Sequence, residues 1–171
     1  LAAAKNESYK TVLEKLESHH FDVISDLIPS ENRSEVIEYV KELFNHLETI
    51  YQGCYLLQEL TPKTLATISS FGELLSSYII AKAANSNFET GYKDSRELII
   101  ASDNYLNASV NFAETNKNIE AFFDGNQKQV TLLPGFVGRT IEGKTTTLGR
   151  GGSDYTAAII AAAVNAEELQ I

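Results

Sequence analysis

Residues 149–163 constrain the fold most strongly, because a glycine-rich loop there runs directly into an unusually apolar segment. The loop reads Gly149-Arg150-Gly151-Gly152 and continues into Ser153-Asp154. Residues 157–163 are Ala and Ile alone. A helix that is apolar on most sides is buried, and one that comes after a glycine turn is typical of packing against a sheet. The segment therefore predicts a buried helix that begins near Ser153.

The surrounding sequence supplies candidate strands for that sheet. Residues 130–133 form a compact apolar run that Pro134-Gly135 ends, as expected for a buried strand. Residues 88–92 predict a short strand, residues 112–123 a short helix, and residues 168–171 the start of another strand. Strands that alternate with helices are typical of a parallel sheet. We therefore expect residues 86–171 to be α/β with a mainly parallel sheet.

The first 85 residues predict helices instead. Apolar residues recur at helical spacing up to Pro29, and a second such run begins at Ser30. A third helix is expected from Pro62 towards Asn85, with Thr61 as its cap. We treat residues 1–171 as one helix-rich domain, or one piece of a larger domain.

Composition excludes several classes of function. The net charge is −9 and Lys and Arg are not clustered, which argues against nucleic acid and anionic lipid as partners. No apolar run reaches the roughly 20 residues of a membrane helix. The single cysteine, Cys54, cannot form an internal disulfide, and we interpret it as a buried structural thiol in a reducing cytoplasm. The three histidines lack metal-ligand spacing, so we expect no protein metal site.

Two neighbouring segments match phosphate-binding patterns. Residues 138–145, GRTIEGKT, fit G-x-x-x-x-G-K-T. A phosphate-binding loop of that kind requires a helix to start at its Lys, because the amides of that helix end hold the phosphates. Here Lys144 is followed by three threonines, whose β-branched side chains disfavour a helix. We therefore expect a strand or an extended loop there, and we interpret the match as chance.

The second segment, residues 149–154, meets the helix requirement. We expect Ser153 or Asp154 to cap the following helix, whose free amides would attract an anion. Arg150 adds a planar guanidinium suited to a carboxylate or phosphate. Asp154 would need a cationic partner, such as a Lys or a metal ion held at the phosphates. The alternative is an ordinary helix cap beside an exposed arginine.

The sequence TTTLGRGGSDYTAA, residues 145–158, resembles the signature of aspartate kinases in the amino-acid-kinase superfamily. Three shorter stretches resemble other motifs of that family in the same order. They are Ser70-Phe71-Gly72-Glu73, Asp94-Ser95-Arg96 and Pro134-Gly135-Phe136-Val137-Gly138.

The resemblance implies a three-layer α/β/α sandwich and a phosphotransferase with a carboxyl group as acceptor. Such an enzyme transfers the γ-phosphoryl group of ATP to the side chain of L-aspartate, with Mg²⁺ bound through the phosphates, and gives 4-phospho-L-aspartate. This reaction opens the synthesis of lysine, threonine, methionine and diaminopimelate. We expect the full-length protein to be a cytoplasmic homo-oligomer.

The resemblance also implies roles for individual residues. Glu73 would bind the α-ammonium group of aspartate, Arg150 would bind a substrate carboxylate, and Ser153 would lie beside the substrate. Asp154 would be catalytic and orient the lysines that neutralise the transferred phosphoryl group. Gly151 and Gly152 would form the loop nearest the phosphates.

The chain also departs from the family pattern. The amino-terminal lysine motif K-F-G-G-[ST]-S is absent, as are the carboxy-terminal nucleotide-binding and regulatory regions. We therefore expect these 171 residues alone to be inactive. The alternatives are another enzyme of the amino-acid-kinase superfamily, a noncatalytic helical interaction module, and a P-loop NTPase.

Overall fold

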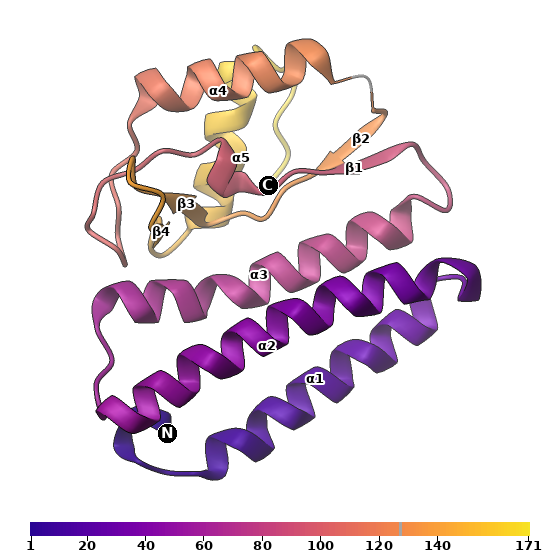
Figure 1. The fold of residues 1–171 in the computed structure, drawn as a ribbon. Coiled ribbons are helices and arrows are strands. Elements are labelled where there is room, and N and C mark those ends of the chain that lie inside the picture. The colour runs from indigo at the N-terminus through magenta and orange to yellow at the C-terminus, as the bar shows by residue number, and fades with distance from the viewer. Residues whose placement is uncertain (127) are drawn as a thin grey trace. The chain divides into compact units, whose positions relative to one another are not determined.

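The computed structural model describes residues 1–126 and 128–171, which divide into two compact units. Unit 1 is Leu1–Thr64 and unit 2 is Leu65–Ile171. The regular elements are drawn in Figure 1. The α-helices are α1 (Ser8–Leu27), α2 (Arg33–Leu57), α3 (Pro62–Ala84), α4 (Phe112–Gly125) and α5 (Gly152–Ala163). The strands are β1 (Thr90–Tyr92), β2 (Val130–Leu132), β3 (Val137–Arg139) and β4 (Thr145–Thr147).

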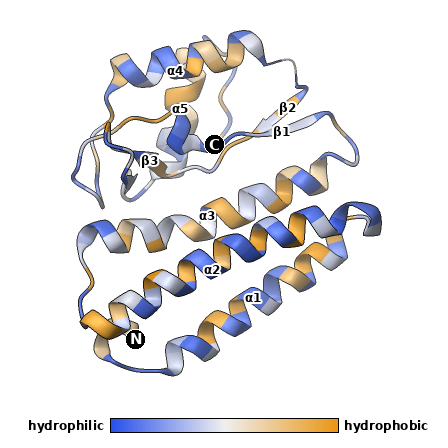
Figure 2. Ribbon diagram, in the orientation of Figure 1, coloured by the Kyte–Doolittle hydropathy of each residue, from blue (hydrophilic) through white to orange (hydrophobic). Residues whose placement is uncertain are grey.

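Unit 1 is a pair of packed helices, as the apolar spacing predicts. In Figure 2, α1 and α2 alternate between orange and blue along their lengths, which is the mark of helices with one buried face. Ile24 of α1 and Val36 and Val40 of α2 are at most 1% exposed. Pro62 begins α3, and Thr61 caps it, because the Thr64 amide donates to the Thr61 hydroxyl at 3.1 Å. The predicted cap is confirmed.

Aromatic residues and the one cysteine cluster near the amino end of unit 1. The rings of Tyr51 and Tyr55 lie within 6 Å of Tyr9, with centroid separations of 5.9 and 5.8 Å. Cys54 is 5% exposed, so the predicted buried thiol is confirmed. Burial raises the pKa of Cys54 and that of Tyr51. The pKa of Tyr55 is raised mainly because its hydroxyl donates to the Glu7 carboxylate at 3.0 Å.

Unit 2 combines helices with two short strand pairs. β1 and β2 pair in parallel and run side by side in Figure 1, while β3 and β4 form an antiparallel hairpin. α4 and α5 pack against each other over a core that includes Ile99, Ile119 and Ile159. The parallel pair agrees with the α/β expectation for this part of the chain, but α5 is buried along one face only, at Gly152, Thr156, Ile159 and Ala163, so the expectation of a helix buried on most sides is wrong. None of the described helices is long and apolar enough to cross a membrane.

One predicted element is wrong. Residues 168–171 adopt no regular structure, although the sequence predicts the start of a strand there. A strand is stable only beside a hydrogen-bonded neighbour, and within the described part of the chain no pairing is recorded for these residues. The local apolar character of these residues was therefore insufficient to predict a strand.

Candidate functional site

The glycine-rich loop leads directly into α5, as the sequence predicts. Gly151 is the N-cap residue and has φ 74°, a left-handed conformation that glycine adopts without strain. The Tyr155 amide then donates to the Gly151 carbonyl at 3.0 Å, which closes the first turn of the helix. The predicted cap by Ser153 or Asp154 is wrong, because no side chain caps α5. Both residues lie within the first turn of the helix, too late in the chain to serve as its cap.

This helix end has the chemistry of an anion site. The first amides of a helix have no intrahelical acceptor, and the helix dipole places partial positive charge there. Arg150 precedes the helix and is exposed, with no ion pair recorded for it within residues 1–126 and 128–171. Asp154 is also exposed and without a recorded ion pair in the same described ranges. A carboxylate or phosphate could therefore approach the loop from solvent.

Glu73 extends from α3 towards the turn that precedes β3. The Gly135 amide donates to Glu73 Oε1 at 3.1 Å. A Cβ atom on Gly135 would lie 2.9 Å from Ser153 Cα, so the turn touches the first turn of α5. Gly135 is required here, since any larger residue would overlap that backbone. Glu73 comes early in the sequence of unit 2 and Ser153 comes late. The structure thus brings both predicted residues to the turn at Gly135.

A hollow of about 550 Å³ lies where these segments meet. Glu73, Gly135 and Ser153 line it together with Thr156 of α5. The rest of its wall is largely apolar and includes Leu132, Leu133, Ile160 and Val164. A few polar groups on an apolar wall are typical of small-molecule sites. Arg150 and Asp154 do not line this hollow, although they lie close to Ser153 in sequence.

The GRTIEGKT segment does not form a phosphate-binding loop. It forms the β3–β4 hairpin, in which the Thr140 amide donates to the Lys144 carbonyl at 2.8 Å and Gly143 turns the chain with φ 80°. Lys144 is exposed and is followed by strand β4 instead of a helix. The prediction of an extended segment after Lys144 is confirmed.

Asp94 and Arg96 form a local ion pair. The Asp94 carboxylate accepts from the Arg96 side chain through two nitrogens, Nε at 3.0 Å and Nη2 at 2.5 Å, and also from the Arg96 amide at 2.9 Å. These bonds cap a short 3₁₀ turn at residues 95–97. The contacts therefore give this motif a structural role, as an ion pair that caps the turn.

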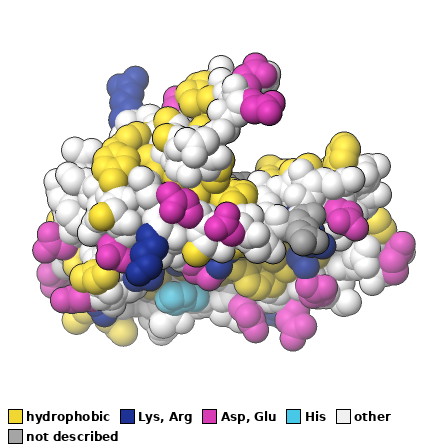
Figure 3. All heavy atoms as spheres, turned by 90° about the horizontal axis from the view of Figure 1, so that it is seen from above, with side chains coloured by type: hydrophobic (Ala, Val, Ile, Leu, Met, Phe, Trp, Pro, Cys, Tyr) yellow, Lys and Arg dark blue, Asp and Glu magenta, His cyan; other side chains and the backbone are white. Residues whose placement is uncertain are grey.

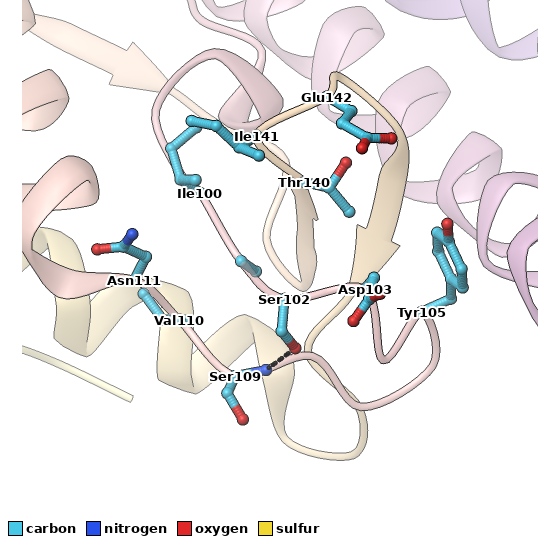
Figure 4. A pocket seen from close by; sticks show the side chains of 11 residues that line it. Ile100, Ser102, Asp103, Tyr105, Ser109, Val110, Asn111, Thr140, Ile141 and Glu142 are labelled. Atoms are coloured by element: carbon cyan, nitrogen blue, oxygen red, sulfur yellow. Dashed lines mark hydrogen bonds between the residues drawn. The ribbon is translucent and has the colours of Figure 1, made fainter.

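A second hollow, of about 450 Å³, lies between the loop of residues 100–111 and the tip of the β3–β4 hairpin. Figure 4 shows Asp103 and Glu142 among its polar side chains, with the Ser109 amide donating to Ser102 Oγ at 3.0 Å. Its described lining contains two carboxylates and neither Lys nor Arg. Neither hollow is lined by Lys or Arg, but only the hollow beside Glu73 and Ser153 includes the first turn of α5, so it is the better candidate.

Charge on one face and the metal-ligand pattern of the described residues indicate no competing site. On the face shown in Figure 3, Lys and Arg side chains are dispersed among Asp and Glu instead of forming one patch. Among the described residues, no group of three or more His, Cys, Asp or Glu could hold a metal ion. His20 is only partly exposed, because its ring packs edge-on against Phe44 at 5.2 Å.

Sequence reasoning missed two contributors to this site. It interpreted Gly135 only as a turn residue, whereas its amide bonds to Glu73. It assigned nothing to Thr156, whose side chain is 3% exposed and bonds to the same turn. A buried hydroxyl within an otherwise Ala- and Ile-rich helix was the available signal, because such a group requires a hydrogen-bond partner.

Known proteins match this chain over most of its length. It is 36% identical over 140 residues to a bifunctional aspartokinase/homoserine dehydrogenase of Buchnera aphidicola, a match that covers 80% of this chain and 17% of that protein. It is 30% identical over 162 residues to an aspartokinase of Chlamydia pneumoniae, covering 94% and 34% respectively. The chain therefore spans about a third or less of the length of these curated relatives.

A solved structure also matches the chain. Escherichia coli aspartokinase III, in complex with aspartate and ADP, superimposes with a TM-score of 0.85 at 24% identity and covers 98% of this chain and 37% of that one. This likeness confirms the α/β fold of the amino-acid-kinase type. The sequence model of the amino acid kinase family matches residues 8–171. This chain belongs to the amino acid kinase family.

Proposed function

We propose that this chain is the amino-acid-binding part of an aspartate kinase, which transfers the γ-phosphoryl group of ATP to the side-chain carboxylate of L-aspartate. The observation that carries the proposal is the convergence of Glu73, through the Gly135 amide at 3.1 Å, with Ser153 on one hollow. The Glu73 carboxylate suits an ammonium group, and the amino end of α5 beside Ser153 suits a carboxylate, so the two together suit an amino acid.

Glu73 is the proposed partner of the substrate ammonium group. One of its carboxylate oxygens accepts from Gly135, which fixes the orientation of the group. The other oxygen is then the one that would face the ligand. An ammonium group left unpaired in a closed site is costly, so this carboxylate would select amino acids over simple dicarboxylates.

Arg150 and the start of α5 are the proposed partners of negative charge. The guanidinium would bind a substrate carboxylate, and Ser153 would lie beside the substrate. Gly151 and Gly152 would bring the backbone close to the phosphates. The acceptor carboxylate is already ionised at neutral pH, so the reaction needs no general base. Catalysis then depends on bringing two anions together in line and neutralising their charge.

ATP would supply the transferred group, with Mg²⁺ carried on its phosphates. The free amides at the start of α5 fit a phosphate, while the described residues offer no dedicated cluster of metal ligands. Asp154 would orient the lysines that approach the phosphates. We assign neither those lysines nor the adenine site to residues of this chain.

The wider assignment is a consequence of the same reaction. The product, 4-phospho-L-aspartate, would enter the synthesis of lysine, threonine and methionine. We place the enzyme in the cytoplasm, in line with its single buried thiol, and expect a homo-oligomer. The family assignment and the aspartokinase relatives support the proposal, and the aspartate and ADP in the E. coli structure show which ligands that relative binds.

The test is substrate-dependent release of ADP by the whole protein, with L-aspartate compared against L-glutamate, N-acetyl-L-glutamate and succinate. We expect turnover with L-aspartate alone. Glu73→Gln should raise the KM for aspartate by about 100-fold, the usual cost of leaving a buried charge unpaired. Glu114→Gln is the matched control, because Glu114 lies in the first turn of α4 and does not line the hollow. Preference for another acceptor would contradict the proposal.

A further inference from the structure

The turn between β2 and β3 contains a strained residue. Phe136 has φ 70°, a left-handed conformation that is a genuine outlier for a bulky side chain. Such a conformation persists only where surrounding contacts hold it, and it is found preferentially at functional sites. Two backbone contacts hold Phe136: its carbonyl accepts from the Leu148 amide at 2.9 Å, and its amide donates to Thr156 Oγ1 at 3.0 Å.

The Thr156 hydroxyl connects that turn to the start of α5. It accepts from the Phe136 amide and donates to the Gly152 carbonyl at 2.8 Å. Its side chain is 3% exposed, so water cannot readily replace either bond. The Phe136 ring packs on the same helix end, where a Cβ atom on Gly152 would lie 2.9 Å from the ring.

Gly135, the residue before Phe136, makes the contact with the Glu73 carboxylate. Gly135 donates to Glu73 Oε1 and lies against Ser153. Because the Gly135 carbonyl and the Phe136 amide share one peptide plane, an acceptor that fixes the Phe136 amide also restricts the orientation of Gly135. The contacts therefore form a continuous connection from α5, through Thr156 and the turn, to the carboxylate on α3.

We propose that Thr156 is a positioning residue, whose hydroxyl holds the strained Phe136 turn so that the Gly135 amide aims the Glu73 carboxylate beside Ser153. The inference rests on the proposed function, in which Glu73 receives the substrate ammonium group. Thr156 lines the hollow but is only 3% exposed, and both bonds of its hydroxyl go to backbone groups, so its proposed role is exerted through the turn.

The chain offers a matched set of variants. Thr156→Val keeps the shape of the side chain but removes the acceptor for the Phe136 amide. Thr156→Ser keeps the hydroxyl and should restore the connection. Thr115→Val is the control, because Thr115 is 0% exposed and its hydroxyl also bonds to both an amide and a carbonyl, those of Ile100. Any loss of stability that comes simply from removing a buried hydroxyl in unit 2 should therefore also occur in Thr115→Val.

The first measurement is residue-resolved amide hydrogen exchange in the whole protein without substrate. Thr156→Val should accelerate exchange at Phe136 and Gly135 by roughly tenfold, since one bond is removed and its neighbour is loosened. Thr156→Ser should return both rates to those of the wild type. Thr115→Val should accelerate exchange at Ile100 and leave the other two amides unchanged.

The second measurement is steady-state kinetics of the same variants. Thr156→Val should raise the KM for L-aspartate by roughly tenfold and leave the KM for ATP within about twofold, with rescue by Thr156→Ser. An unchanged KM for aspartate, or equal effects from Thr115→Val, would overturn the positioning role. Unchanged exchange at Gly135 and Phe136 would overturn it as well.

The two measurements separate this inference from the proposed function. If the wild-type protein phosphorylates another acceptor, the proposed function fails, but the exchange data still decide whether Thr156 orders the Gly135 amide. If aspartate is the substrate and Thr156→Val behaves as the wild type does in both measurements, the proposed function survives and this inference fails.

Discussion

Two glycine-rich segments of unit 2 lead into different secondary structure, and that difference determines their chemistry. Residues 138–145 run into β4, where three threonines pair with β3 as a hairpin. Residues 149–152 run into α5, whose Ala- and Ile-rich sequence favours a buried helix. Only the second segment leads into a helix amino terminus. Glycine spacing alone therefore says little about phosphate binding, because the next element in the chain decides where the backbone amides point.

The largest expected effect that tests this comparison comes from Arg150→Ala. Removal of the exposed guanidinium should lower kcat/KM for L-aspartate by about 100-fold or more, as is usual for a lost charge-assisted donor in an active site. Thermal unfolding should be nearly unchanged, since no ion pair involving Arg150 is recorded within residues 1–126 and 128–171. Steady-state kinetics with a parallel melting curve would check both. Near-normal turnover would show that residues 149–152 are not part of the substrate site.

An intermediate effect is expected from a matched pair of glycines. Gly143 in the hairpin and Gly151 at the helix have φ 80° and 74°, and an added Cβ would meet nothing within 4 Å at either position. Gly143→Ala and Gly151→Ala should therefore destabilise the fold equally, by roughly 1–2 kcal/mol each in urea unfolding. Only Gly151→Ala should also raise the KM for ATP severalfold, because Gly151 is proposed to lie close to the phosphates. If both variants raised it alike, the hairpin would share the site.

The smallest effect is expected from Lys144→Met. Lys144 is exposed at the end of the hairpin, so its loss should change both turnover and KM for ATP by no more than about twofold, as for most surface substitutions. The measurement is ADP release at saturating and at limiting ATP. A large loss of ATP affinity would revive the P-loop interpretation that the hairpin geometry opposes.

Much of the fold could be predicted because it depends on local patterns. The spacing of apolar residues predicts α1 and α2, and Thr61-Pro62 predicts the start of α3. The β-branched threonines predict that residues after Lys144 are extended. Each of these signals lies within a few residues of the element that it determines.

The elements and contacts that failed, or were missed, depend on distant partners. The strand expected at residues 168–171 has no recorded pairing within the described ranges, and the cap of α5 shifted to Gly151 because that residue already adopts the left-handed turn. The Glu73–Gly135 bond joins residues 62 positions apart, and the Phe136–Thr156 bond joins residues 20 apart. Family resemblance indicated Glu73 and Ser153, but spacing along the chain could not show that one turn holds them together.

The single thiol of α2 provides a chemical probe of local opening in unit 1. Cys54 is the only cysteine in the sequence and is 5% exposed, with its pKa raised by burial. A maleimide should therefore react only when Cys54 becomes transiently exposed, and each molecule can be tagged once. The rate of tagging, measured by mass spectrometry, would give the frequency of such openings. It would not report on changes at the glycine loop before α5.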